Sequence, residues 1–244
     1  MRIRLVLKTV LLKKNEEMSV FLLHNEEVIF PHPQLAGEDG LLAVGGDLSL
    51  ERLLSAYRFG IFPWYNEDDP VLWWSPDPRF VVLPGKVITS KSMRQEMKKF
   101  RLTLDHDFEA VIRACSTVPR KEQDGTWITE EMTRAYLELH RSGYAHSFET
   151  WKEGCLVGGL YGVSLGRCFF GESMFSLVPN ASKYAFIRLS QVLEEKKFRL
   201  IDCQVPTDHL KRMGCKNIER TEFLQILREN NLEPTFRGSW SGWV

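Results

Sequence analysis

The sequence lacks the long apolar run of a membrane protein, and it lacks a clear export signal. No stretch approaches the roughly 20 consecutive apolar residues of a spanning helix. The N-terminal segment mixes basic and apolar side chains, but Lys8 interrupts the apolar run and no small-residue cleavage site follows it. We therefore expect a cytoplasmic protein that is not exported and has no membrane partner.

A net charge of one sign is also absent, because 32 Lys and Arg residues balance 32 Asp and Glu residues. A nucleic acid would therefore have to be held by a local basic patch. The five cysteines include no C-x-x-C pair, and the histidines do not have metal-ligand spacing. We expect reduced, mostly buried thiols and no metal site.

Internal repeats and low-complexity tracts are absent as well, and hydrophobic periodicity predicts an α+β fold. After a turn-rich region over residues 30–84, three β-like runs over 145–176 suggest an antiparallel meander. A helix then leads to a further short strand, LIDCQV, which we expect to lie near the strand RCFFGESMFS. Helices are predicted over residues 50–59, 92–99, 130–142 and 181–197, with Ser49 and Asn180 as N-caps of the first and last.

Three polar side chains stand out in the strand-like runs. Glu172 follows Gly171 in an apolar stretch, while Asp202 and Gln204 are two residues apart and should share one face of a strand. A buried carboxylate is costly unless it is paired or used in chemistry. Alternatively, these side chains hydrogen-bond neighbouring backbone or a buried arginine, and spacing alone does not decide between the two interpretations.

The segment from Arg79 to Arg101 carries seven basic residues and one acidic residue, Glu96. In a chain of zero net charge, this imbalance favours contact with a phosphate backbone. The alternative is an ordinary solvated helix face. A set of aromatic residues in and near proline-rich turns could in addition stack on an unpaired base, although most tryptophans serve packing; its members are Trp64, Tyr65, Trp73, Trp74 and Trp127.

A series of motifs extends in register from about Phe30 to Gly214: GLLAVGGDLS, GIFPWY, LWWSPDPR, GTWIT, HSFETW, LVGGLYGV, FFGESMFS, NASK and LIDCQ. By these motifs the chain resembles the leucyl/phenylalanyl-tRNA–protein transferases. Several multi-residue motifs in order are far more specific than a single short pattern.

The resemblance implies a small family-specific N-terminal domain followed by a GNAT-like acyltransferase domain with a mixed sheet. We expect an N-terminal extension over residues 1–17, an N-terminal domain over 18–95, a catalytic domain over 96–232 and a C-terminal tail over 233–244. The extension and the tail, which ends in FRGSWSGWV, carry no motif that matches the family.

The resemblance also implies an activity: Leu or Phe, in some cases Met, moves from aminoacyl-tRNA to a protein that begins with Arg or Lys. The acceptor would thereby be marked for degradation by the N-end rule pathway, and the implied reaction uses no cofactor because an aminoacyl ester is already activated. Asp202, Gln204 and Glu172 match the catalytic residues, and we assign Asp202 an electrostatic or base role and Gln204 an orienting one. Glu172 is expected to bind the incoming amine or its basic side chain.

Binding residues follow from the same motif matches. Trp64 and Trp127 match aromatics that hold the aminoacylated 3′ adenosine. The residues that match the pocket for the transferred side chain are Phe169, Met174, Ser176, Leu160 and Ile201, with Leu160 standing where Met is expected. The basic residues that we expect to contact tRNA are Lys91, Arg94, Lys98 and Lys99.

Three rival functions agree less well with these residues. A CoA-dependent acetyltransferase would need a Q/R-x-x-G-x-G/A segment for the pyrophosphate, and the sequence has none. A ligase of cell-wall peptides that uses aminoacyl-tRNA fits the GESMFS and LIDCQ motifs less well. A non-catalytic RNA-binding adaptor would keep the basic helix but would not need Asp202 and Gln204 together.

Overall fold

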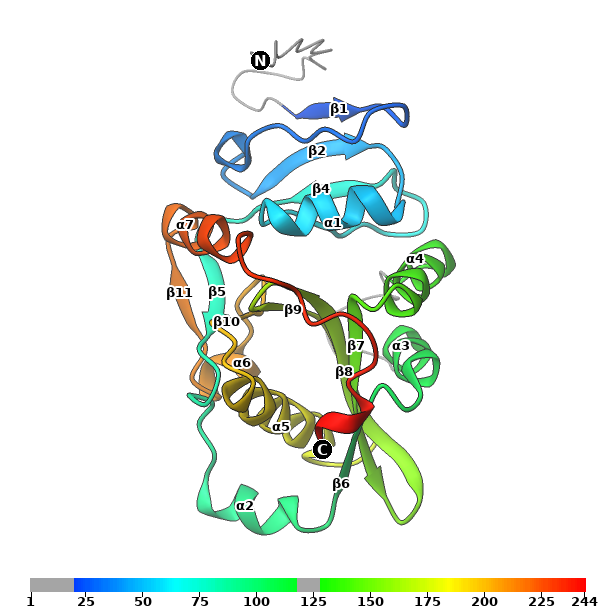
Figure 1. Ribbon diagram of the computed structural model, residues 1–244, viewed down its shortest axis with the longest axis vertical. Coiled ribbons are helices and arrows are strands. Elements are labelled where there is room, and N and C mark those ends of the chain that lie inside the picture. The colour runs from blue at the N-terminus through cyan, green and yellow to red at the C-terminus, as the bar shows by residue number, and fades with distance from the viewer. Residues whose placement is uncertain (1–19, 118–127) are drawn as a thin grey trace.

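The computed structural model describes residues 20–117 and 128–244, which form two sheets and the helices that cover them (Figure 1). The smaller sheet has the strand order β1-β2-β4-β3, and the larger has the order β11-β5-β10-β9-β8-β7-β6. The strands are β1 (Phe21–Leu23), β2 (Leu41–Gly45), β3 (Phe62–Pro63), β4 (Leu72–Trp74), β5 (Arg79–Val82), β6 (Arg101–Leu104), β7 (Ala145–Lys152), β8 (Cys155–Leu165), β9 (Cys168–Ser176), β10 (Leu200–Asp202) and β11 (Lys216–Ile218).

Along the chain, most helices come between strands of the larger sheet or after its last strand. They are α1 (Leu50–Arg58), α2 (Lys91–Met97), α3 (Phe108–Thr117), α4 (Glu130–Arg141), α5 (Ala181–Glu195), α6 (Asp208–Arg212) and α7 (Arg220–Asn230), with short 3₁₀ turns η1 (Pro33–Leu35) and η2 (Ser241–Trp243). Within the two described ranges, no helix is both long enough and apolar enough to cross a bilayer.

The larger sheet is mixed, as the sequence predicts. Strands β7, β8 and β9 form the expected antiparallel meander, and β10 lies beside β9 in parallel after the chain has passed through α5. Strand β5 then pairs antiparallel with both β10 and β11. Because β5 belongs to this sheet, the chain enters the larger sheet at Arg79, before the expected domain division at residues 95–96.

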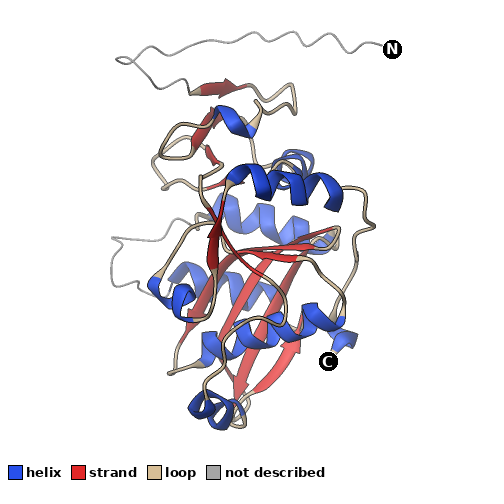
Figure 2. Cartoon of the chain, turned by 90° about the vertical axis from the view of Figure 1, so that its left-hand side faces the viewer, coloured by secondary structure: helices blue, strands red, loops and turns tan. Residues whose placement is uncertain are grey.

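Helices cover the two faces of the larger sheet and create two apolar cores. Helix α5 packs on one face, and α3 and α4 pack on the other. The core on the α3 side continues without interruption into the smaller domain, where it contains α1 residues such as Leu53 and Tyr57. Figure 2 shows the smaller sheet stacked at one end of the larger one. The two sheets are therefore joined by a shared core.

The expected helices are present, but two of their caps work differently. Ser49 is the N-cap of α1 without a side-chain hydrogen bond, and its own backbone N–H donates to Asp47 Oδ1 (2.9 Å). Asn180 precedes α5 in a left-handed conformation (φ 69°), also without a side-chain cap. Ser176 Oγ accepts from the Ser182 N–H (3.2 Å) and so caps the first turn of α5. All five cysteines are free thiols.

Candidate active site

A cavity of about 560 Å³ lies where the end of the smaller domain meets β8, β9, β10, α5 and the segment that leads into α6. Its volume is that of an ordinary small-molecule site. Much of its wall is apolar, formed by Leu160, Met174, Phe186, Leu189, Ile201 and Leu210. Glu172 and Gln204 supply polar groups to the same cavity. Such a site can bind an apolar side chain beside a reacting polar group.

Glu172 reaches the cavity because β9 contains a bulge. Tyr161 of β8 is paired with Ser173 and the next residue, Gly162, is paired with Gly171, so that Glu172 is the additional residue between them. A bulge breaks the strict alternation of side chains and can direct one side chain into a site. Glycine is required beside it, since a Cβ on Gly162 would lie 2.2 Å from the Phe170 carbonyl oxygen.

Two hydrogen bonds hold the carboxyl group of Glu172, a residue that is only 8% exposed. Tyr136 Oη donates to Oε2 (2.8 Å), and Gln204 Nε2 donates to Oε1 (2.9 Å). Burial raises the pKa of Glu172 to about 7, although the bond from Tyr136 and the nearby Tyr57 hydroxyl act to lower it. At neutral pH the group is thus able both to accept and to release a proton.

Gln204 follows β10 with a left-handed backbone (φ 63°), which is uncommon for a residue other than glycine. Its backbone is held at both ends, because its N–H donates to Asp202 Oδ1 (2.9 Å) and its carbonyl accepts from the Phe80 N–H (3.2 Å). Strained backbone of this kind persists where surrounding contacts enforce it. Here it directs the Gln204 amide toward Glu172.

Asp202 does not face the cavity with Glu172 and Gln204. Both of its carboxylate oxygens bind the buried Arg79 guanidinium, from Nε to Oδ1 (2.9 Å) and from Nη2 to Oδ2 (2.6 Å). The expectation that Asp202 and Gln204 share one strand face is therefore wrong, because β10 ends at Asp202 and the left-handed turn follows. The alternative interpretation, in which a buried arginine pairs with the carboxylate, is correct for Asp202.

Arg79 is fixed by more than its ion pair. Its Nη1 donates to the Gly60 carbonyl (3.1 Å), and its guanidinium lies over the rings of Phe62 (4.8 Å) and Phe223 (4.6 Å). The side chain is only 1% exposed. Arg79 is consequently not part of a basic surface, and the basic segment predicted from the sequence loses its first member.

The residues expected around the transferred side chain divide into two groups. Leu160, Met174 and Ile201 line the cavity. Phe169 is fully buried and does not line it. Ser176 also lies away from the wall, where its hydroxyl donates to the Val178 carbonyl (2.9 Å) and caps α5.

The aromatic and basic candidates lie outside this apolar wall. Trp64 lines the cavity from the smaller domain and packs against Trp74, with ring centroids 6.0 Å apart. Trp127 lies outside the described residues. The four expected tRNA contacts, Lys91, Arg94, Lys98 and Lys99, are exposed on or just after α2, and Lys99 pairs with Glu96 (2.7 Å). This helix contributes no residue to the cavity wall.

Sequence reasoning missed two tyrosines that support the site. Tyr136 of α4 bonds Glu172, and Tyr57 of α1 bonds Tyr136 hydroxyl to hydroxyl. Burial raises the pKa of both phenols well above the usual value, so they remain neutral donors. In the sequence each tyrosine occupies an ordinary apolar helix position, which gives no sign of this role.

Comparison with known proteins identifies the family. The sequence pattern described as leucyl/phenylalanyl-tRNA protein transferase matches residues 81–228, and the pattern for its N-terminal domain matches residues 46–77. The leucyl/phenylalanyl-tRNA–protein transferase of Syntrophus aciditrophicus is 58% identical over 216 residues, which cover 88% of this chain and 90% of that one. The transferase of Myxococcus xanthus is 53% identical over 227 residues, which cover 92% and 97%.

Among solved structures, L-PGS from Bacillus licheniformis aligns with 69% of this chain and 53% of its own, at 14% identity and a TM-score of 0.38. A likeness at that level leaves the GNAT-like relationship a prediction. The sequence relatives, by contrast, agree over nearly the full chain. On that evidence the chain belongs to the leucyl/phenylalanyl-tRNA protein transferase family, and it is an aminoacyltransferase that acts on proteins.

Proposed function

We propose that the cavity binds the leucyl or phenylalanyl group of an aminoacyl-tRNA, and in some cases a methionyl group, for transfer to the N-terminal Arg or Lys of a protein. The observation that carries the proposal is a cavity lined both by an apolar wall and by the buried Glu172, whose pKa burial raises to about 7. The acceptor would then enter the N-end rule degradation pathway. We place the reaction in the cytoplasm, where charged tRNA is found.

The reaction needs positioning and proton transfer more than activation. The acceptor nitrogen attacks the ester carbonyl, a C–N bond forms, and the C–O bond to the ribose breaks. A protein α-amino group with a pKa near ~8 is mostly protonated at neutral pH, so it must first lose a proton. The nitrogen loses a second proton as the amide forms, and the ribose oxygen takes a proton as it leaves. No ATP is consumed, because the aminoacyl ester is already activated.

Glu172 is the group best placed to take the first proton. Its pKa of about 7 lies close to that of the ammonium group, which makes the transfer nearly balanced in free energy. Gln204 donates to Glu172 through Nε2, and its amide oxygen can accept a hydrogen bond from the amine. Together the two side chains would orient the amine toward the ester carbon.

Asp202 acts on this pair indirectly in our proposal. Arg79 binds both of its oxygens, and this ion pair leaves Asp202 poorly placed as a proton acceptor. Its bond to the Gln204 N–H instead fixes the strained turn that orients the Gln204 amide. We therefore assign to Glu172 the base role that the sequence analysis gave to Asp202, and Asp202 becomes a positioning residue.

Selection of the transferred side chain would come from the apolar wall. Leu160 and Met174 lie directly opposite each other on β8 and β9, and Ile201 of β10 completes this part of the wall. One methylene in such a pocket changes discrimination by only about 1–3 kcal/mol. We therefore expect Leu, Phe and Met to be accepted with modest differences and polar side chains to be rejected through the cost of their desolvation.

The tRNA would be held at two places. Trp64, which lines the cavity from the smaller domain, would stack on the terminal adenosine. The exposed side chains of Lys91, Arg94 and Lys98 on and beside α2 would contact phosphates of the tRNA body without reading its sequence. Transfer and tRNA binding therefore depend on separate groups of residues.

A matrix of donors and acceptors tests this proposal. The protein is incubated with radiolabelled Leu-, Phe-, Met- or Ile-tRNA and with matched peptides that begin with Arg, Lys, Ala or Glu. We expect labelled product from the first three donors and from Arg and Lys peptides only. A CoA thioester is included as an alternative donor. Equal labelling of the Glu peptide, or efficient transfer from the thioester, would contradict the proposal.

A further inference from the structure

The C-terminal tail, which no motif explained, is anchored in the larger domain by one tryptophan. After α7 the chain runs along the α5 side of the sheet and ends in η2 beside β6 (Figure 1). Trp240 of this tail is only 1% exposed and belongs to the core beneath α5. It lies beyond residues 81–228, which the family pattern matches. A side chain of this size is not buried by a loose tail.

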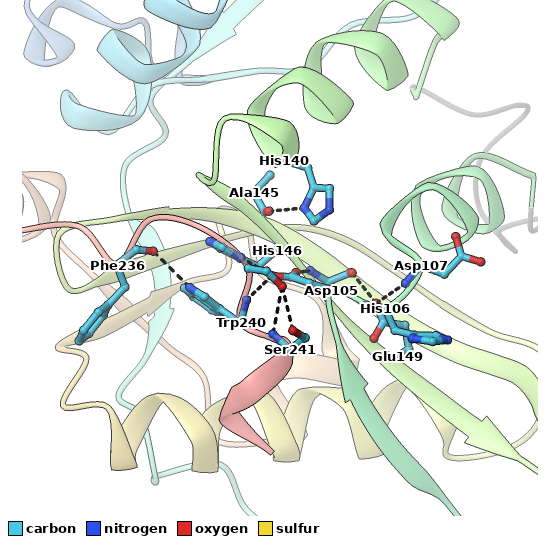
Figure 3. Close-up of polar contacts among 12 residues, drawn as sticks. Asp105, His106, Asp107, His140, Ala145, His146, Glu149, Phe236, Trp240 and Ser241 are labelled. Carbon is cyan, nitrogen blue, oxygen red and sulfur yellow. Dashed lines mark hydrogen bonds and ion pairs between the residues drawn. The ribbon is translucent and has the colours of Figure 1, made fainter.

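Trp240 is held by a charged residue and a stacked ring. Asp105 Oδ2 accepts from the backbone N–H of Trp240 (2.7 Å) and also bonds His146 Nδ1 (2.8 Å), while Oδ1 accepts from the backbone N–H of Ser147 (2.9 Å). The indole N–H of Trp240 donates to the Phe236 carbonyl (3.2 Å). The His146 imidazole stacks on the indole, with ring centroids 3.6 Å apart and planes 8° from parallel. Figure 3 shows Trp240, His146 and Asp105 together. The indole therefore has a fixed position and orientation.

The indole also contacts two buried aromatic rings of the sheet. Its centroid lies 6.4 Å from that of Phe148 and 6.1 Å from that of Phe169, and the Phe148 and Phe169 centroids are 6.2 Å apart. The Phe148 ring meets the indole edge to face, at 84°. Trp240 thus closes a cluster of three rings on the α5 side of the sheet.

Sheet register connects this cluster to the cavity. Phe148 of β7 lies directly opposite Leu160 of β8, and Phe169 of β9 lies directly opposite Ile201 of β10. All four side chains belong to the core that contains Trp240. Side chains that face each other across neighbouring strands are in direct packing contact. Leu160 and Ile201 line the cavity, so each has one phenylalanine between it and the indole.

We propose that Trp240 is a positioning residue for the acyl pocket and that it sets how far the wall formed by Leu160 and Ile201 extends into the cavity. The inference rests on the proposed function, because it assumes that this cavity selects the transferred side chain. Without the indole, Phe148 and Phe169 shift into part of the vacated space, because the structure around a cavity relaxes into it partially. Leu160 and Ile201 then recede, and the pocket becomes deeper for a bulky side chain.

The test compares Trp240→Ala with Trp243→Ala. Trp243 comes from the same tail and stacks on Trp240, with centroids 4.2 Å apart, but has no ring contact with Phe148 or Phe169. The full chain is assayed with Leu-tRNA and Phe-tRNA and an Arg peptide, at a temperature where melting curves show each variant folded. We expect the Leu-to-Phe ratio of kcat/KM to fall about fivefold in Trp240→Ala and to remain within about twofold of wild type in Trp243→Ala.

A merely structural role would give a different pattern. Loss of folded enzyme lowers kcat for both donors equally and leaves both KM values and the ratio unchanged, and that result would overturn the inference. Trp240→Phe is the second variant, which retains a smaller ring; we expect a shift in the same direction and of lesser size. An unchanged ratio in this variant and in Trp240→Ala would also overturn it. Wild-type enzyme that is inactive with both donors would instead refute the proposed function, and the inference with it.

Discussion

Replacing Glu172 by Gln should stabilise the protein above neutral pH and have little effect in acid. Burial raises the pKa of Glu172 from 4.5 to about 7. Between these two pH values the folded chain therefore holds a proton that the unfolded chain has lost. Stability falls as pH rises through that window. The Gln side chain of the variant cannot titrate, and its amide can still accept from Tyr136 Oη, so the variant does not suffer this loss.

The size of the effect follows from the same pKa. At about 1.4 kcal/mol per pH unit, a rise from 4.5 to about 7 corresponds to about 3 kcal/mol of unfolding free energy. The contribution is fully present below pH 4.5 and is lost above pH 7. The unfolding free energy of Glu172→Gln minus that of wild type should consequently increase by about 3 kcal/mol between about pH 4.5 and about pH 8.

Urea unfolding of both proteins at half-unit pH steps measures this difference, and other titrating groups cancel because they are common to both. Glu195→Gln, at an exposed position on α5, is the matched control and should follow the wild type at each pH. A difference between Glu172→Gln and wild type that does not change with pH would refute the assignment of a near-neutral pKa to Glu172.

Two further predictions concern residues outside the cavity. Replacing Lys91, Arg94 and Lys98 together by Ala should weaken tRNA binding and flatten the slope of log affinity against log salt by about 2–3, if each contacts one phosphate. Transfer from a short aminoacyl-adenosine should not change. Equal losses of transfer from intact aminoacyl-tRNA and from the aminoacyl-adenosine would assign the helix a structural role. Asp202→Ala should lower single-turnover transfer about 100-fold with tRNA affinity retained, because Gln204 loses the bond that fixes its turn and its amide is misplaced. Urea unfolding should show a loss of about 3–5 kcal/mol because Arg79 is left buried without its partner.

The sequence predicted the meander of the larger sheet and several helix ends, for physical reasons. The meander from Ala145 to Ser176 has long β-rich runs bounded by Glu153-Gly154 and Gly166, and turns of that kind leave few alternatives. Helix ends were also predictable, since Gly60 and Gly143 adopt the positive φ that a helix C-terminus favours (71° and 78°). Local patterns of this kind determine elements independently of tertiary contacts.

Side-chain direction at the site was not predictable by the same means. Period-two alternation places Asp202 and Gln204 on one face, but it cannot anticipate the left-handed turn at Gln204. Nor does it reveal the bulge at Glu172, which depends on the pairing of β8 with β9. The partner of Asp202 lies 123 residues away at Arg79. These features arise from long-range contacts that a single sequence does not display.

The central claim is that the buried carboxyl group of Glu172 takes the proton of the incoming amine. The most direct measurement is the single-turnover rate of transfer from Leu-tRNA to an Arg peptide, as a function of pH, for wild type and Glu172→Gln. We expect the wild-type rate to rise through about pH 7, as the carboxylate forms. The Gln variant should be at least about 100-fold slower at neutral pH and should follow only the titration of the acceptor amine near pH ~8. A Gln variant with the wild-type rate and the wild-type pH profile would contradict the account.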